Sequence, residues 1–287
     1  MRMAALLLAG LAALLPAGCG RSDAITARPA LWRATNGPVT VWLFGSMHLL
    51  PKDVAWQGPA IDRAVADSDS LILEVPGDRD PKAQAAIFLR HARTGGLPPI
   101  AARVSDPSAL DKAIAAAGTS AATLDGLKSW AAAVLLGTGA GRAQGASAEY
   151  GVEAVLARRF ADKPQEAFES VEGQLTMLDT LPEPAQRVLL DQAVADAANG
   201  EANYRATLAA WSAGDTSRIA ATFDRDFAKA PALEEVLITQ RNRRWADAIA
   251  ARKGGTVLVA VGAGHMVGTN ALPALLNARG FRVARVQ

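Results

Sequence analysis

Cysteine, histidine and aromatic residues are scarce in this chain of 287 residues. The single cysteine, Cys19, excludes a disulfide bond within the chain. Lys and Arg together number 30 and Asp and Glu together number 28, so the chain carries almost no net charge. The basic residues are scattered and form no stripe interleaved with aromatic side chains. We therefore expect no nucleic-acid partner.

The common catalytic signatures are missing as well. The sequence has no His-Glu-x-x-His helix, no Walker loop and no Gly-x-Ser-x-Gly elbow, which argues against the enzyme classes built on them. The glycines at 262, 264 and 268 imitate a dinucleotide-binding loop. Only one predicted helix and one predicted strand follow them, which is too little for a nucleotide-binding half.

The first 18 residues have the features of an export signal, with a short positive start and an apolar run at 4–15. This run is too short to cross a bilayer, which needs about 20 residues. Cys19 follows small residues and resembles the lipidated cysteine of a bacterial lipobox, although Pro16 stands where leucine is usual. The alternative is ordinary cleavage with an incidental thiol. We expect an exported protein in the periplasm or cell envelope, with a tether at 19–37 and membrane contact only through a lipid on Cys19.

The hydrophobic pattern predicts strands at both ends of the chain and helices between them. It indicates a single α/β domain over 38–287, in which segments 38–105 and 231–287 build one mostly parallel sheet and 106–230 form a large helical insertion. The predicted strands are 39–44, 70–75, 256–261 and 281–286, with a further short one at 165–169. The predicted helices are 59–66, 81–93, 108–117, 123–136, 151–161, 171–179, 184–199, 201–213, 216–228, 232–252 and 271–278.

Two of the three histidines follow a buried strand in the same frame, Gly-x-x-His. His48 follows the first predicted strand, and His265 follows the apolar strand near the end of the chain. Open α/β sheets bind ligands at the carboxyl edge of their strands, so the two side chains are expected to converge there. A lone histidine in such a place is usually structural, but the repeated frame favours function.

Glu74 ends the second predicted strand, where it is either a solvated strand end or a ligand at the sheet edge. Desolvating a carboxylate without a partner is costly, and a cation would resolve that cost. His48, Glu74 and His265 together form a set that suits Zn²⁺, Mn²⁺ or Fe²⁺ and leaves open positions for water or substrate.

Arg241 falls on the apolar stripe of the predicted helix at 232–252. It either reaches the solvent at the rim or points into the site, where it would pair with a carboxylate or bind substrate oxygens. Glu169 either caps the helix that follows it or supplies a second carboxylate to the site. We predict that Glu169 acts as a general base and that Arg241 stabilises negative charge.

These landmarks, in this order, resemble the TraB/GumN family, which includes the Tiki proteins. The resemblance covers residues 38–287 and departs from the family in two places: Glu153 stands where aspartate is usual, and Phe168-Glu169-Ser170 stands for Leu-Glu-Thr. The matching segments are 45–51 (GSMHLLP), 71–75 (LILEV), 151–153 (GVE), 168–174 (FESVEGQ), 241–246 (RNRRWA) and 262–268 (GAGHMVG).

The resemblance implies an α/β core with a helical insertion and a paired Gly-x-x-His site. Tiki members are described as metal-dependent proteases and TraB members as pheromone-shutdown proteins. The fold is also thought to be similar to haem-binding ChaN lipoproteins and erythromycin esterases. We expect a metal-dependent hydrolase that acts on a peptide or small molecule. The alternative is a non-catalytic periplasmic protein that binds a peptide, haem or metal.

Overall fold

A computed structural model describes residues 25–76, 80–228 and 230–287 of the chain. The predicted export signal and Cys19 lie outside the described residues. Within the described ranges, no helix is both long enough and apolar enough to cross a membrane.

Six strands form one sheet in the order β6-β5-β7-β3-β2-β8. The pairs β6–β5, β5–β7 and β7–β3 are parallel, and β2 pairs antiparallel with both β3 and β8. Two further strands, β1 and β4, pair with each other. The strands are β1 Ile25–Thr26, β2 Leu31–Asn36, β3 Val39–Ser46, β4 Val54–Ala55, β5 Ser70–Leu73, β6 Gln165–Ala167, β7 Gly255–Gly262 and β8 Arg282–Arg285.

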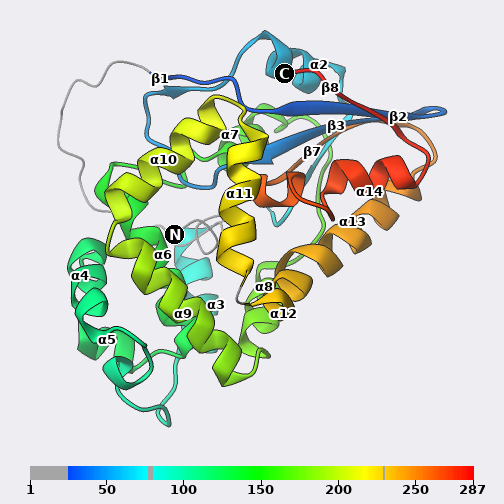
Figure 1. Ribbon diagram of the computed structural model, residues 1–287. Helices are drawn as coiled ribbons and strands as arrows, with labels where there is room; N and C mark the ends of the chain where they lie inside the picture. Colours follow the sequence, from blue (N-terminus) through cyan, green and yellow to red (C-terminus); the bar gives the residue numbers. More distant parts are fainter. Residues whose placement is uncertain (1–24, 77–79, 229) are drawn as a thin grey trace.

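Most of the helices come from the middle of the chain and gather below the sheet in Figure 1. A π-helical segment, Glu235–Thr239, separates α12 from α13, and a 3₁₀ turn, Ala263–Met266, follows β7. The helices are α2 Pro59–Asp67, α3 Pro81–Ala92, α4 Pro107–Ala117, α5 Ala121–Asp125, α6 Ser129–Ala143, α7 Val152–Arg159, α8 Val171–Asp179, α9 Glu183–Ala197, α10 Gly200–Ser212, α11 Thr216–Phe227, α12 Pro231–Glu234, α13 Gln240–Ala250 and α14 Leu272–Ala278.

The central strands are apolar on both faces because the sheet is covered on both sides. On one face, Val41 and Val259 pack in a core that also holds residues of α13 and α14. On the other face, Trp42 and Phe44 pack in a larger core with residues of α2 and of the insertion helices. The buried sheet therefore fixes the positions of the turns that follow β3 and β7.

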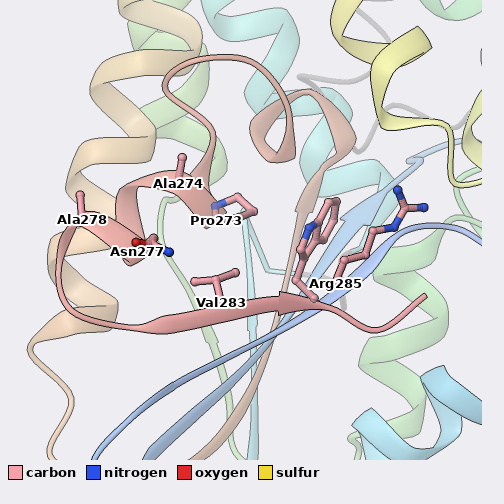
Figure 2. A pocket seen from close by; sticks show the side chains of 7 residues that line it. Pro273, Ala274, Asn277, Ala278, Val283 and Arg285 are labelled. Carbon is pink, nitrogen blue, oxygen red and sulfur yellow. The ribbon is translucent and has the colours of Figure 1, made fainter.

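A surface hollow lies between α14 and β8 (Figure 2). Pro273 and Asn277 of α14 line it on one side, and Val283 and Arg285 of β8 line it on another. The guanidinium of Arg285 is already bound to the carbonyl oxygens of Gly214 and Gln287. None of the predicted site residues lines this hollow.

The α/β fold with a mostly parallel sheet is confirmed, and β8 closes the chain as an edge strand. The tether predicted over 19–37 is wrong for its described part, because residues 25–26 form β1, Ala27 and Ala30 are buried, and residues 31–36 form strand β2 inside the sheet. The insertion also supplies the opposite edge strand, β6. The helix predicted over 123–136 is two helices, α5 and α6, and the helix predicted over 232–252 is interrupted by the π-helical segment.

Candidate functional site

The two Gly-x-x-His turns lie next to each other at the carboxyl edge of the sheet. β3 and β7 are neighbouring parallel strands in which Ser46 is paired with Gly262. His48 lies two residues after Ser46, where β3 ends, and His265 lies three residues after Gly262, where β7 ends. Both side chains are buried, and His48 is close enough to His265 and Glu74 to interact electrostatically with both.

Close backbone approach requires glycine at two positions around these turns. A Cβ atom on Gly151, just before α7, would overlap the carbonyl oxygen of His48. A Cβ atom on Gly264 would overlap the ring of Phe223 in α11. The insertion helices are therefore packed directly against both histidine turns.

Hydrogen bonds from the insertion also hold the first turn in place. The indole N–H of Trp211 in α10 donates to the carbonyl of Gly45 at 2.8 Å. The hydroxyl of Tyr204 donates to the carbonyl of Leu49 at 3.1 Å, and the backbone N–H of Val152 donates to Met47 at 3.1 Å. These bonds fix the backbone on both sides of His48.

His265 is held in one tautomer by its neighbours. Its Nδ1 lies 2.7 Å from Oδ1 of Asn242, whose amide nitrogen donates to the carbonyls of His265 and Asn270. Because the amide oxygen can only accept, Nδ1 carries the proton and Nε2 presents a lone pair. Burial, and next the positive charge of Arg241, lower the pKa of His265 to about 3, so this imidazole is neutral at pH 7.

His48 is paired with a buried carboxylate. Its Nδ1 lies 2.7 Å from Oε1 of Glu153 in α7, and the hydroxyl of Ser46 donates to the same oxygen. Burial opposes ionisation of Glu153, but the electrostatic interaction with His48 and these hydrogen bonds outweigh it, and the pKa of Glu153 is lowered. The carboxylate therefore accepts the Nδ1–H bond, and His48, like His265, turns its Nε2 away from the partner that orients it.

Glu74 is fully buried directly after β5 and accepts three hydrogen bonds. Arg241 Nη2 donates at 2.5 Å and Gln174 Nε2 at 2.7 Å to Oε1, while the backbone N–H of Gly262 donates to Oε2 at 3.1 Å. Burial raises the pKa of Glu74, but Arg241 and the two histidines lower it more strongly, to about 2. Oε2 lies 4.0 Å from Nε2 of His265.

Arg241 is fully buried in α13 and uses its whole guanidinium inside the site. Nε and Nη2 bind the two oxygens of Glu169 at 2.9 Å each, and Nη1 donates to the carbonyl of Leu237 at 2.9 Å. Nη1 also lies 3.2 Å from the Nε2 lone pair of His265. Burial lowers the pKa of Arg241, but the carboxylates of Glu74 and Glu169 raise it overall. The sequence left two alternatives for Arg241, which either reaches the solvent or points into the site. The structure shows the second, in which Arg241 pairs with carboxylates.

An aromatic stack and an irregular helix hold Arg241 in this position. The guanidinium lies 4.7 Å above the ring of Trp245, which also stacks on Phe168 and contacts the ring of His265. The carbonyl of Leu237, which accepts from Arg241, belongs to the π-helical segment. Such segments are rare and occur often at functional sites.

The structure brings together all five predicted site residues: His48, Glu74, Glu169, Arg241 and His265. Glu169 does not cap α8; the hydroxyl of Ser170 does, by accepting from the Gly173 N–H. Sequence reasoning assigned no role to Glu153, Gln174 or Trp245. Glu153 occurs in one of the family-like segments, and its place beside apolar Val152 was the one available signal that its side chain is buried.

The donor set fits a divalent metal in its chemistry. Both histidines donate Nδ1–H to an oxygen acceptor, which is the arrangement that orients metal-ligating histidines and leaves Nε2 for the metal. Glu74 and His265 already contact one cation, the guanidinium of Arg241. As these side chains are placed, however, no three His, Cys, Asp or Glu side chains of the described residues surround a common point.

Comparison with known proteins confirms the family resemblance seen in the sequence. The family model described as "TraB/PrgY/gumN family" matches residues 30–285. The chain is 26% identical over 267 residues to the uncharacterized protein YbaP of Escherichia coli (strain K12), covering 86% of this chain and 96% of YbaP. YbaP of Shigella flexneri matches to the same extent, and no solved structure matches. This chain therefore belongs to the TraB/PrgY/gumN family.

Proposed function

We propose that this protein is a metal-dependent hydrolase in which His48, Glu74 and His265 hold a divalent zinc, manganese or iron ion. One observation carries the proposal: two buried histidines follow neighbouring parallel strands, and each is oriented through Nδ1 by an oxygen acceptor. Orientation of this kind is typical of histidines whose other ring nitrogen, here Nε2, binds a metal ion. Glu74, beside both, adds the carboxylate of a two-histidine, one-carboxylate set.

The residues around this set orient the histidines, stabilise charge and move a proton. When bound, such a metal supplies a water of lowered pKa and polarises a scissile carbonyl. Glu153 holds the imidazole of His48 in one tautomer, and Asn242 does the same for His265. Arg241 stabilises negative charge on the substrate. Glu169, which is 15% exposed and therefore the most open carboxylate of the cluster, serves as general base.

A peptide or another small molecule with a hydrolysable carbonyl is the proposed substrate class. The acidic companions of the histidines support hydrolysis over simple ligand binding, because ligation of haem iron needs no carboxylate pair. The rival is a protein that binds a peptide, haem or metal without turning it over, and the experiment below separates the two.

The test is a hydrolysis screen on purified protein whose metal content has been measured by mass spectrometry. A mixed peptide library is incubated with the protein, with chelator, and with chelator followed by Zn²⁺, Mn²⁺ or Fe²⁺. We expect cleavage that the chelator stops and one metal restores. His48→Ala and His265→Ala should abolish both metal binding and cleavage, since each removes a ligand.

The third histidine supplies a matched control. His91 lies in α3, where it contacts Glu172 at the surface, so His91→Ala removes the same side chain outside the site. It should keep full activity. Cleavage that survives the chelator and both site variants would contradict the proposal. Tight binding of peptide, haem or metal with no cleavage in any condition would favour the binding protein.

We also propose that the chain is exported and anchored by lipid at Cys19, on the strength of its first 19 residues. Intact-mass measurement of protein extracted from membranes should give a mature chain that begins at Cys19 and carries acyl groups. A soluble mature chain that begins elsewhere, with an unmodified thiol, would contradict the anchor.

A further inference from the structure

Arg241 already occupies the cation position of the candidate metal site. Its Nη2 donates to Oε1 of Glu74, and its Nη1 lies 3.2 Å from Nε2 of His265. These are two of the three proposed metal ligands. In the described structure, the positive charge that compensates the buried Glu74 carboxylate is therefore the guanidinium.

The contact between Arg241 and His265 and a bond from His265 to a metal exclude each other. An unprotonated Nε2 has one lone pair in the ring plane, and this pair now faces the Nη1–H of Arg241. A metal ion needs that same pair. In a site removed from water, a second positive charge next to the first is also strongly repelled.

Arg241 has enough other partners to give up this contact without losing its place. Nε and Nη2 are held by Glu169, Nη1 also donates to Leu237, and the guanidinium stacks on Trp245. Release of His265 costs one hydrogen bond among several. Glu169 also keeps a second cation beside it when the guanidinium of Arg241 shifts, because Nη2 of Arg244 lies 3.8 Å from its Oε1.

We propose that Arg241 is a built-in competitor of the metal: it binds Glu74 and His265 in the metal-free protein and releases His265 when a divalent ion arrives. The inference rests on the proposed metal site. It makes Arg241 a residue that sets metal affinity, so the affinity of the natural protein is lower than its ligands alone would give.

The test is calorimetric titration of chelator-stripped protein with Zn²⁺ alone, with the metal affinity as the readout. Arg241→Gln removes the charge and should lower the dissociation constant for zinc by at least about tenfold. Arg241→Lys keeps the charge and should bind zinc within about threefold of the wild-type protein. His265→Ala should lose zinc binding, and His91→Ala should bind as the wild type does.

Thermal unfolding adds a second readout on the same samples. Without zinc, Arg241→Gln leaves the buried Glu74 carboxylate without its cation and should melt at a lower temperature than the wild type. Zinc should raise its melting temperature more than it raises that of the wild type, because the ion then takes over the missing charge. If Arg241→Gln does not fold, the structure of the wild-type protein with zinc decides, and we expect Nη1 to have left Nε2 of His265.

The inference is overturned if Arg241→Gln binds zinc no more tightly than the wild type, or if zinc-bound wild-type protein keeps the contact between Arg241 and His265. Neither result touches the proposed hydrolysis, provided that His48→Ala and His265→Ala still lose zinc and activity together. Conversely, tighter zinc binding by Arg241→Gln in a protein that cleaves nothing would support the competition and contradict the hydrolase.

Discussion

His265 should make the stability of the metal-free protein depend on pH. Burial and Arg241 lower its pKa from 6.5 to about 3, so the native state stays unprotonated where the unfolded chain takes up a proton. The contribution of His265 to stability is complete above pH 6.5 and is lost as the pH falls toward 3. At pH 4.5 the loss amounts to about 3 kcal/mol, at about 1.4 kcal/mol for each pH unit.

Urea unfolding of chelator-treated protein between pH 7 and 4.5 measures this loss. In this window Glu74 adds little, because its depressed pKa of about 2 makes its own contribution fall away only between pH 4.5 and 2. The free energy of unfolding of the wild type should drop about 3 kcal/mol more than that of His265→Gln, which cannot titrate. His91→Ala controls for the loss of a histidine elsewhere. Parallel curves for the wild type and His265→Gln would refute the reasoning.

Three further substitutions test the supports of the site. Gly151→Ala places a Cβ against the carbonyl of His48 and should destabilise the protein by about 1–3 kcal/mol in urea unfolding, whereas Gly58→Ala, which meets open space, should change little. Glu153→Gln keeps the shape of the side chain but loses its charge, and should lower kcat/KM about 10–100-fold. An unchanged kcat/KM would show that Glu153 does not orient His48. Trp211→Phe loses the indole bond to the first histidine turn and should cost about 1 kcal/mol; an unchanged midpoint in urea would show that this bond contributes nothing.

The strands and the meeting of the two histidines could be predicted from the sequence because they depend on local patterns. The apolar runs of β3 and β7 are typical of central parallel strands, and parallel strands end at the same edge. Glu74 could be placed by the same reasoning. β2 was missed because its sequence, Leu-Trp-Arg-Ala-Thr-Asn, has neither a continuous apolar run nor a strict alternation of apolar and polar residues, and its buried residues Leu31 and Ala34 are three positions apart.

Apart from the pairing of Arg241 with a carboxylate, the partners of the site residues could not be predicted, because they depend on how helices pack over the sheet edge. An acidic residue in the first turn of a helix, such as Glu153, ordinarily interacts with the helix dipole, and nothing local to it indicates a histidine from β3. The π-helical segment before α13 could not be predicted either, because a single extra residue in a helical turn leaves the spacing of the apolar residues almost unchanged. This segment contains Leu237, whose carbonyl accepts a hydrogen bond from Arg241.

The position of β7 in the sheet has a consequence for when the site comes into being. β7 lies between β3 and β5, yet both of those strands precede the whole helical insertion in the chain. Until the last segment arrives, β3 and β5 have no common neighbour, and His48 and Glu74 have nothing to keep them together. A chain still being synthesised therefore carries no assembled site. Insertion of the strand that brings His265 completes the sheet and the chemistry in one step, late in folding, as expected for contacts so distant in sequence.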